Sequence, residues 1–482
     1  MTRLILLFLF FLFYINADAS QLAVPASNVY KKYGEMPGML QFRGNPSHTF
    51  YGMGPVPTDP QQLWRYPERA MSGPSSVGGK TKTWVGTGWT GQPLVWPGND
   101  GQGWEVVFGA YDHDVHFVDW KTGEARAKPF PTNDIIKGTA TIDPDGYPLL
   151  YFGSRDNYFR IVALDQNPRE ELWKLNGQNR PGRVWNNDWD GNATIVNDHL
   201  IVGGENSLFY VIKINRGYDE NGRVTVDPKI VVEMPGYNKA LFSLTGDRNV
   251  SIESSVAVFE NRAYFANSGG RIVGVDLDKV DSYSKPEDII VFDFWVGDDT
   301  DASIVIDEEG MLYVAVERER RGKKSKEKHE ELGQLVKLNP YATSGVENPV
   351  VWENPPIILK SSGGGYYDSG IWATPALANG YLYVPTHNGP FFIVDKDSGE
   401  VVWETDIIKR SWSSPLVVDS KLIIANCRGT IMSFDVMNPE SPELEWTHKI
   451  PSGACIESTP LLWEGHIIVG TRDGFVYAIG DQ

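Results

Sequence analysis

A strand–turn–strand pattern recurs eight times along the chain, and it constrains the fold more than any other feature of the sequence. In the clearest copy, the apolar run that begins at Tyr381 is followed by a turn and by a second apolar run that ends at Asp395. Other clear copies end at Asp165, Asp276, Asp435 and Gly480, and weaker copies end at Asp119, Asn215 and Asn339. Consecutive copies end 40 to 63 residues apart, an interval of roughly fifty residues that is typical of the blades of a β-propeller.

Each copy contains enough sequence for four strands. The β-branched and aromatic residues around Gly, Asn and Asp turns indicate an antiparallel hairpin. A strand that starts with small residues precedes the hairpin, as in 372–375, 412–415 and 457–460. A strand with a tryptophan follows several hairpins, at Trp173, Trp295, Trp352, Trp403 and Trp446. We therefore predict an all-β fold, an eight-bladed propeller of four-stranded antiparallel blades.

The two ends of the repeat array predict how the ring closes. The last copy has no strand of the tryptophan-bearing kind after it, whereas Gln62–Tyr66 is such a strand without a blade of its own. Pairing these two segments would complete the eighth blade and remove an exposed sheet edge. We expect one propeller domain over residues 61–482, with residues 61–70 as the closing strand, preceded by an N-terminal extension over residues 20–60.

The first nineteen residues predict export. Arg3 precedes a continuous apolar run from Leu4 to Ile15, and an Ala-x-Ala sequence ends at Ala19. This arrangement is typical of a cleavable signal peptide, and no later segment is apolar enough to span a membrane. The formal net charge of −18 repels nucleic acid. We expect a secreted or periplasmic protein, a monomer without a transmembrane segment, that binds no nucleic acid.

Aligned inner strands predict a ring of side chains at the channel mouth. Three residues before the expected starts of the eight strands stand Thr90, Gly138, Asp190, Glu253, Asp301, Trp372, Trp412 and Glu457. Four carboxylates and two indoles would converge there, which suits a sugar, a cationic group or calcium. Asp190, Glu253, Asp301, Trp372, Trp412 and Glu457 are the predicted ligand-binding residues. The alternative is that these side chains only pack and fill the channel.

The remaining polar segments have simpler interpretations. Asp112, His113, Asp114 and His116 contain metal-ligating types, but an Asp-rich turn is a normal way to close a hairpin. Arg155 and Arg472 each precede an Asp, which favours local ion pairs. The insertion 185–190 mixes indoles, amides and acids, as a carbohydrate cleft or a capping loop does. The basic insertion 318–331 is expected to be a solvated loop, or else a docking loop for an acidic partner.

The repeat resembles that of the pyrroloquinoline-quinone (PQQ) propeller family. The resemblance is in the sequences Tyr-Phe-Gly-Ser at 151–154 and Ala-Leu-Asp at 163–165, in the following strand with Trp, and in Gln-Phe-Arg-Gly at 41–44. It implies either a quinoprotein alcohol or sugar dehydrogenase or a cofactor-free scaffold of the outer-membrane assembly type. The dehydrogenases carry a disulfide between adjacent cysteines, a calcium or lanthanide ion and an Asp base.

The two cysteines are Cys427 and Cys455, 28 positions apart, so the vicinal disulfide of the dehydrogenases is absent. Cys427 is expected in the turn of blade seven and Cys455 just before the inner strand of blade eight, where a structural disulfide between them suits an exported protein. We therefore expect a cofactor-free module that binds a small molecule, a carbohydrate or a protein at the mouth. The alternative is a PQQ- and calcium-dependent dehydrogenase, with Glu253 and Asp301 as metal ligands or base. A weaker option is an acid/base enzyme that acts on carbohydrate.

Overall fold

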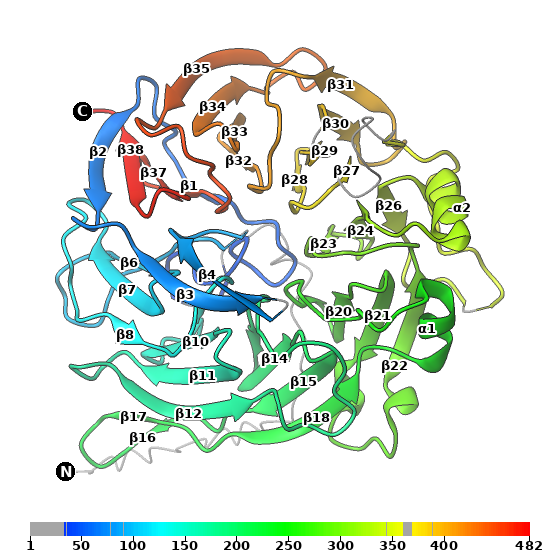
Figure 1. The fold of residues 1–482 in the computed structure, drawn as a ribbon, viewed down its shortest axis with the longest axis horizontal. Coiled ribbons are helices and arrows are strands. Elements are labelled where there is room, and N and C mark those ends of the chain that lie inside the picture. Colours follow the sequence, from blue (N-terminus) through cyan, green and yellow to red (C-terminus); the bar gives the residue numbers. More distant parts are fainter. Residues whose placement is uncertain are drawn as a thin grey trace, which may run out of the picture.

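Eight antiparallel sheets surround a central channel in the computed structural model (Figure 1). The structure describes residues 33–34, 36–77, 79–89, 91–343, 345–359, 369–387 and 389–482. The predicted signal peptide and Thr90 therefore lie outside the described residues. Within the described part of the chain, no helix is long and apolar enough to cross a membrane.

The first four blades follow one another along the chain, each with its innermost strand first. Blade one contains β5 (Leu94–Trp96), β6 (Glu105–Gly109), β7 (Asp114–Asp119) and β8 (Phe130–Pro131). Blade two contains β9 (Thr141–Ile142), β10 (Leu149–Gly153), β11 (Tyr158–Ala163) and β12 (Glu170–Asn176). Blade three contains β13 (Thr194–Val196), β14 (His199–Gly203), β15 (Leu208–Lys213) and β18 (Lys229–Pro235). Blade four contains β19 (Ala257–Phe259), β20 (Arg262–Ala266), β21 (Arg271–Asp276) and β22 (Ile290–Trp295).

The second half of the ring repeats this order. Blade five contains β23 (Val305–Ile306), β24 (Leu312–Ala315) and β26 (Leu335–Leu338). Blade six contains β28 (Ala376–Ala378), β29 (Tyr381–Val384), β30 (Phe391–Asp395) and β31 (Val401–Thr405). Blade seven contains β32 (Leu416–Val418), β33 (Lys421–Ala425), β34 (Thr430–Asp435) and β35 (Glu443–Lys449). Blade eight contains β36 (Leu461–Trp463), β37 (His466–Gly470), β38 (Val476–Gly480) and β2 (Gln61–Tyr66), and the short strand β1 (Gly52–Met53) pairs in parallel with the inner edge of β36.

Short elements connect or cover the blades. They are the strands β1 (Gly52–Met53), β3 (Ser72–Val77), β4 (Lys80–Val85), β16 (Gly217–Tyr218), β17 (Val224–Thr225), β25 (Glu317–Arg318) and β27 (Ser369–Gly370), and the helices α1 (Lys239–Thr245) and α2 (Lys323–Leu332). Two single 3-10 turns, Leu277–Lys279 and Pro286–Asp288, lie between β21 and β22. The middle strands of the blades are almost wholly buried, because apolar side chains on both faces pack against the neighbouring blades.

The closing strand is confirmed by its pairing and by a shared irregularity. β2 pairs antiparallel with β38, with Gln62 opposite Ile479 and Trp64 opposite Ala478, so Leu63 is an extra, bulged residue. β12, β31 and β35 have the same register shift directly before Trp173, Trp403 and Trp446. A bulge increases local strand twist, as the outermost strand of a twisted blade requires. β2 therefore has the local structure of an outer strand, and its pairing joins the two ends of the ring.

The N-terminal extension fills the channel. Leu40, Arg43 and His48 are completely buried, and His48 Nδ1 lies 2.7 Å from the carbonyl of Ile304 in blade five. The Arg43 guanidinium donates to the carbonyls of Thr374, Pro375 and Pro415 in blades six and seven. These partners directly precede the inner strands and come two or three residues after the predicted mouth residues Asp301, Trp372 and Trp412. The segment therefore closes the channel below the mouth, which the sequence did not predict.

Two local predictions in blade five are wrong. The outer strand around Trp352 is reduced to one bridge between Leu338 and Val350. The basic insertion is not a solvated loop, because it forms β25 and α2, and the side chains of Ser325, His329 and Leu332 in α2 are buried. His329 Nε2 lies 2.9 Å from a carboxylate oxygen of Asp298, which anchors the helix beside the channel mouth.

Candidate functional site

The residues that precede the inner strands meet on the channel axis. Five of the six predicted ligand-binding residues line one small pocket together with Trp89: Asp190, Glu253, Asp301, Trp372 and Trp412. They meet because each inner strand starts at the predicted position or one residue after it, so the same position of each blade faces the axis. The sixth residue, Glu457, does not line this pocket.

Three indoles form one wall of the axial pocket. Trp372 and Trp412 stack with ring centroids 5.3 Å apart and an interplanar angle of 13°. Trp89 meets both rings edge-on, at centroid distances of 5.9 and 5.8 Å. Trp412 Nε1 donates a 2.5 Å hydrogen bond to His387 Nδ1, which fixes the orientation of its ring. Trp89 has a positive φ of 54°, an uncommon conformation for a bulky residue, so the local fold holds this indole in place at an energetic cost.

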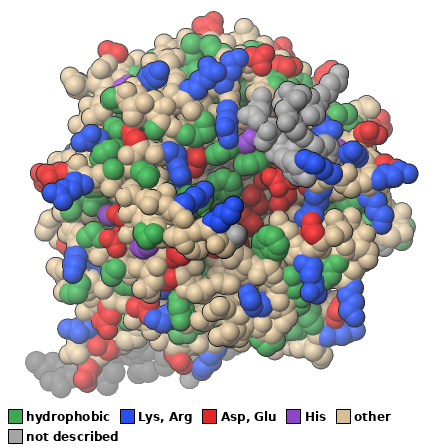
Figure 2. All heavy atoms as spheres, viewed as in Figure 1, with side chains coloured by type: hydrophobic (Ala, Val, Ile, Leu, Met, Phe, Trp, Pro, Cys, Tyr) green, Lys and Arg blue, Asp and Glu red, His purple; other side chains and the backbone are tan. Residues whose placement is uncertain are grey.

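A larger cavity of about 640 Å³ opens beside the axial pocket and shares Trp89, Glu253 and Asp301 with it. Its volume lies within the range that small-molecule sites usually have. Its lining includes the indoles of Trp84, Trp89 and Trp185, the carboxylates of Glu205, Glu253, Asp299, Asp301 and Glu319, and the cations of Lys137 and Arg155. Figure 2 shows the hollow near the centre of this face, where hydrophobic and acidic side chains meet.

Trp185 belongs to the rim of this cavity. Its side chain is 53 % exposed, and its backbone also has a positive φ, of 70°. Two of the three cavity indoles therefore stand on strained backbone, and such positions cluster at binding sites. The insertion that carries Trp185 also supplies Asp188 and Asp190 to the acidic side.

Lys137 is the centre of the first acidic group. Its Nζ lies 3.0 Å from Asp188, 2.6 Å from Asp190 and 3.1 Å from Glu205. Burial lowers the pKa of Lys137, but these carboxylates outweigh it and raise the pKa well above the ordinary value. The ligand oxygens of the three acids lie within 4.8 Å of one another, a separation that suits a metal ion, yet the Lys137 ammonium already contacts all three.

The second acidic group lies in blades four and five. Burial, with the charges of Asp301 and Glu205, raises the pKa of Glu253 well above its ordinary value. Burial and neighbouring carboxylates act in the same direction on the pKa values of Asp299, Asp301 and Glu317. None of the ion pairs among the described residues joins these four acids to a Lys or Arg within 4.0 Å. Asp299 Oδ1, Asp301 Oδ1 and Glu317 Oε1 are buried without a hydrogen-bond partner.

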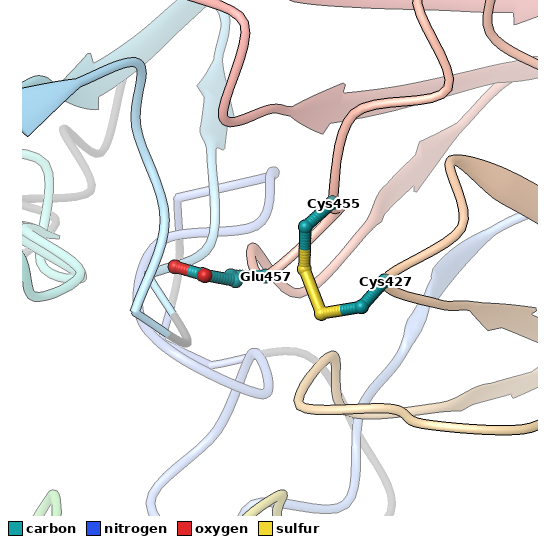
Figure 3. Close-up of side chains that lie close together, drawn as sticks. All are labelled: Cys427, Cys455 and Glu457. Carbon is teal, nitrogen blue, oxygen red and sulfur yellow. A yellow bond between two sulfur atoms is a disulfide. The ribbon is translucent and has the colours of Figure 1, made fainter.

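Glu457 lies in a separate corner of the mouth. Cys427 and Cys455 form a disulfide beside it that joins the turn of blade seven to the entry of blade eight (Figure 3). Arg472 Nη1 lies 3.6 Å from the Glu457 carboxylate, and the backbone N–H of Arg472 donates to the carbonyl of Cys455. Burial raises the pKa of Glu457, while Arg472 opposes this shift. The disulfide and the contacts of Arg472 therefore fix the position of Glu457 without a ligand.

The arginines of the hairpin turns do not form the local ion pairs that the sequence predicted. Arg155 pairs with Asp188 at 3.0 Å, and Arg472 pairs with Glu457, so neither arginine forms a local ion pair with the adjacent Asp. His116 is bonded through both ring nitrogens, to the hydroxyl of Tyr66 and to the carboxylate of Asp112. Arg155, in the turn of blade two, extends to the loop that leads into blade three, whereas Arg472, in the turn of blade eight, pairs with the loop before the inner strand of its own blade.

Sequence comparison matches part of the chain. The family model described as outer membrane protein assembly factor BamB matches residues 348–480, which hold blades six to eight. No curated protein sequence matches the chain.

Solved structures of similar fold cover most of the chain. BamB from Moraxella catarrhalis is 12 % identical at a TM-score of 0.54, covering 88 % of this chain and 98 % of its own. A europium-containing methanol dehydrogenase is 13 % identical at a TM-score of 0.57, covering 95 % of this chain and 100 % of its own. Quinohemoprotein alcohol dehydrogenase from Comamonas testosteroni is also 13 % identical at a TM-score of 0.57, covering 95 % of this chain and 82 % of its own. The chain is a PQQ-like repeat β-propeller. Because identities are this low, the similarity establishes the fold and leaves the activity to the residues of this propeller.

The axial residues of this propeller do not fit the quinone. PQQ is a planar tricyclic tricarboxylate, which needs a slot beside an aromatic ring and cationic partners for its carboxylates. Here Trp372 and Trp412 stack on each other, and Trp89 covers their edges. The adjoining cavity is lined by five carboxylates and two cations, and both cations, Lys137 and Arg155, are already paired with acids of the protein. The disulfide, which joins blades seven and eight, is also not of the vicinal type.

Several site residues were missed from the sequence. Trp89 lies next to the aligned position, Thr90, and a loop of irregular backbone brought its indole to the axis. Asp299 is two residues before Asp301 in the run Gly297-Asp-Asp-Thr-Asp301, so this local cluster of acids was an available signal. Lys137 had no such signal, because a single lysine before a strand is ordinary.

Proposed function

We propose that this protein is an exported, cofactor-free binding or scaffold module whose ligand occupies the cavity at the channel mouth. One observation supports this most directly. Asp190, Glu253, Asp301, Trp372 and Trp412 come from five different blades and line one pocket with Trp89. Side chains that only filled a channel would satisfy their polar atoms, whereas Asp190 Oδ1, Asp301 Oδ1 and Trp372 Nε1 are buried without partners.

The floor of the channel supports a binding role. The N-terminal segment bonds to residues that directly precede the inner strands of blades five and six, so it obstructs the channel next to the mouth residues. A ligand that enters from the mouth meets indoles and carboxylates in the same cavity. Pockets that combine apolar walls with a few polar groups are typical of small-molecule sites.

A protein partner is the other kind of occupant for this face. The matched family model is described as an assembly factor, which supports a scaffold role on the same propeller. Such a partner would insert a side chain into the cavity, with Trp185 at the rim as an exposed contact. Tryptophan residues at the edge of a pocket commonly contribute strongly to protein–protein binding.

Binding to the mature chain (residues 20–482) tests this proposal. Intrinsic tryptophan fluorescence and thermal shift would be recorded against a library of small cations, sugars and peptides, and proteins captured from a periplasmic extract would be identified. The expected result is a saturable signal that is lost in Trp372→Ala/Trp412→Ala and retained in Trp403→Phe, a change on the outer strand β31. A signal that both variants keep would show that Trp372 and Trp412 only pack and fill the channel.

The competing function is the PQQ- and calcium-dependent dehydrogenase. Its support is the group of buried carboxylates in blades four and five, which includes Glu253 and Asp301. Reconstitution with PQQ and calcium separates the two functions. The dehydrogenase would be supported, and the binding module rejected, by a stoichiometric quinone spectrum together with dye-linked oxidation of an alcohol or sugar. This oxidation should be lost in Asp301→Ala.

A further inference from the structure

The charges around the cavity are unevenly paired. Lys137 forms ion pairs with Asp188, Asp190 and Glu205, and Arg155 adds a second contact to Asp188. Arg320 pairs with Asp247 at 2.6 Å and contacts Asp298 at 3.7 Å. Lys137, Arg155 and Arg320 therefore each form ion pairs with acidic side chains of the protein itself.

Among the residues that the structure describes, no Lys or Arg lies within 4.0 Å of the carboxylates of Glu253, Asp299, Asp301 or Glu317. Glu253, Asp299 and Asp301 line the open cavity, and Glu317 lies behind them. Asp299 is 7 % exposed and Glu317 is 2 % exposed, and each has a buried carboxylate oxygen without a hydrogen-bond partner. Buried ionised groups without a partner are costly, so the site lacks a positive charge that a ligand would supply.

The arrangement of these acids favours an organic cation over a metal ion. Among the described residues, the all-carboxylate group whose oxygens converge within 4.8 Å is Asp188, Asp190 and Glu205, and Lys137 already holds it. Glu253, Asp299 and Asp301 do not converge in this way and instead follow one wall of the cavity. A metal ion needs several converging oxygens, whereas an ammonium group can bind to acids spread along a wall.

The indoles that line the same cavity suit the apolar part of such a ligand. Trp84, Trp89 and Trp185 present indole surface to the same cavity. The protein already places cations on indoles of this face, since Lys82 Nζ lies 3.9 Å from the Trp84 ring centroid and the Arg410 guanidinium 4.2 Å from that of Trp412. Indole faces attract ammonium groups and contact methyl and methylene groups well.

We propose that the ligand of this cavity is a small alkylammonium compound, with its cationic group against Glu253, Asp299 and Asp301 and its apolar part against Trp84, Trp89 and Trp185. This inference rests on the proposed function and specifies its ligand class. Lys137, whose ammonium is bound by the neighbouring acids, is the model within the chain for how this mouth holds such a group.

Calorimetry with matched ligands tests the ligand class. The mature protein would be titrated with choline and butane-1,4-diamine, and with 3,3-dimethylbutan-1-ol, the neutral isostere of choline. We expect at least one of the two amines to bind, and the neutral alcohol to bind at least tenfold more weakly than choline if choline is the ligand. Glu253→Gln/Asp301→Asn should weaken amine binding at least tenfold, whereas Glu443→Gln on the outer strand β35 should not change it.

The outcomes separate this inference from the proposed function. If the alcohol and the amines bind equally and this binding is lost in Trp372→Ala/Trp412→Ala, the proposed binding function stands. The inference that the ligand is a cation is then wrong. Stoichiometric binding of calcium or terbium that is lost in Glu253→Gln/Asp301→Asn would replace the amine by a metal ion. Absence of binding by either amine to a folded protein would overturn the inference. The thermal unfolding of each variant shows that it is folded, and for wild type a rise of amine affinity with pH gives a second readout that needs no variant.

Discussion

The ammonium of Lys137 lies 2.6 Å from a carboxylate oxygen of Asp190, and both side chains are almost fully buried at the mouth of the channel. Lys137 comes from the loop before blade two and Asp190 from the loop before blade three. The ion pair therefore joins neighbouring blades at the ligand face, and it links the stability of the ring to the geometry of the site.

Replacing Lys137 should destabilise the protein and create a metal site. Lys137→Met leaves Asp190 and Glu205 without their cation and Asp188 with Arg155 alone, and removing one partner of a buried ion pair costs about 3–5 kcal/mol. Because the three acids converge within 4.8 Å, calcium should restore most of this loss. Urea unfolding with calcium or with EDTA measures both effects. Lys174→Met, at a 46 % exposed lysine, is the control. A variant as stable as wild type, or one indifferent to calcium, would contradict the role assigned to Lys137.

The stability of the ligand-free protein should fall as the pH rises above about 4, the ordinary pKa of a carboxyl group. Burial and neighbouring acids raise the pKa values of Glu253 and Asp301, so the native state keeps protons that the unfolded chain has lost. Raising the pH then favours the unfolded state, by up to about 1.4 kcal/mol per pH unit for each such carboxyl, until the native groups ionise. Urea unfolding between pH 4.5 and 8 measures this slope. It should flatten in Glu253→Gln/Asp301→Asn, and identical slopes in variant and wild type would show that these two acids are not responsible.

Loss of the Cys427–Cys455 disulfide should destabilise the protein by about 3–4 kcal/mol, because the bond closes a loop of 28 positions between two blades. Guanidinium unfolding with and without dithiothreitol measures this effect, and Cys427→Ser/Cys455→Ser should not respond to the reductant. The disulfide lies beside Glu457 (Figure 3), whereas the axial acids lie elsewhere in the mouth. Ligand binding by the folded double variant should therefore be retained, and a large loss of affinity would place the disulfide in the site.

Replacing Arg43 should open the floor of the channel. Its guanidinium donates to the carbonyls of Thr374, Pro375 and Pro415, and burial lowers its pKa to about 10. Arg43→Met leaves these carbonyls unpaired in the interior, which should cost about 3 kcal/mol or more. Thermal unfolding measures the change, and Arg223→Met, at an exposed arginine, is the control. Equal effects of the two substitutions would argue against a structural floor.

Much of the fold was predictable because a propeller repeats one local pattern. Each hairpin such as that ending at Asp395 has its own turn and its own alternation of apolar residues, so eight weak signals support one another. The outer strand of blade five was not predictable, because strand pairing depends on neighbouring chain. Near Trp352 it is reduced to a single bridge. The helix α2 was also missed, because its buried face of Ser325, His329 and Leu332 is not an apolar stripe.

The candidate site was predictable in part for the same reason. Asp190, Glu253 and Asp301 share one position of the repeat, so the symmetry of the ring places them together without knowledge of any contact. Trp89 and Lys137 reach the site through irregular loops, to which no repeat applies. Which acid is paired also has no signal in the sequence, since it depends on where the Lys137 ammonium lies.

The sequence by itself determined the eight blades, the closing strand and the face on which the acids and indoles gather, because these follow from strand periodicity and from a repeat that closes on itself. The tertiary structure alone decided that the N-terminal segment fills the channel, that Lys137 pairs with one acidic group, and that Glu253, Asp299 and Asp301 form no ion pair with a Lys or Arg among the described residues. These features depend on distances between residues far apart in the chain. Electrostatic and hydrogen-bond energies depend on such distances and on burial, and neither is encoded in local pattern.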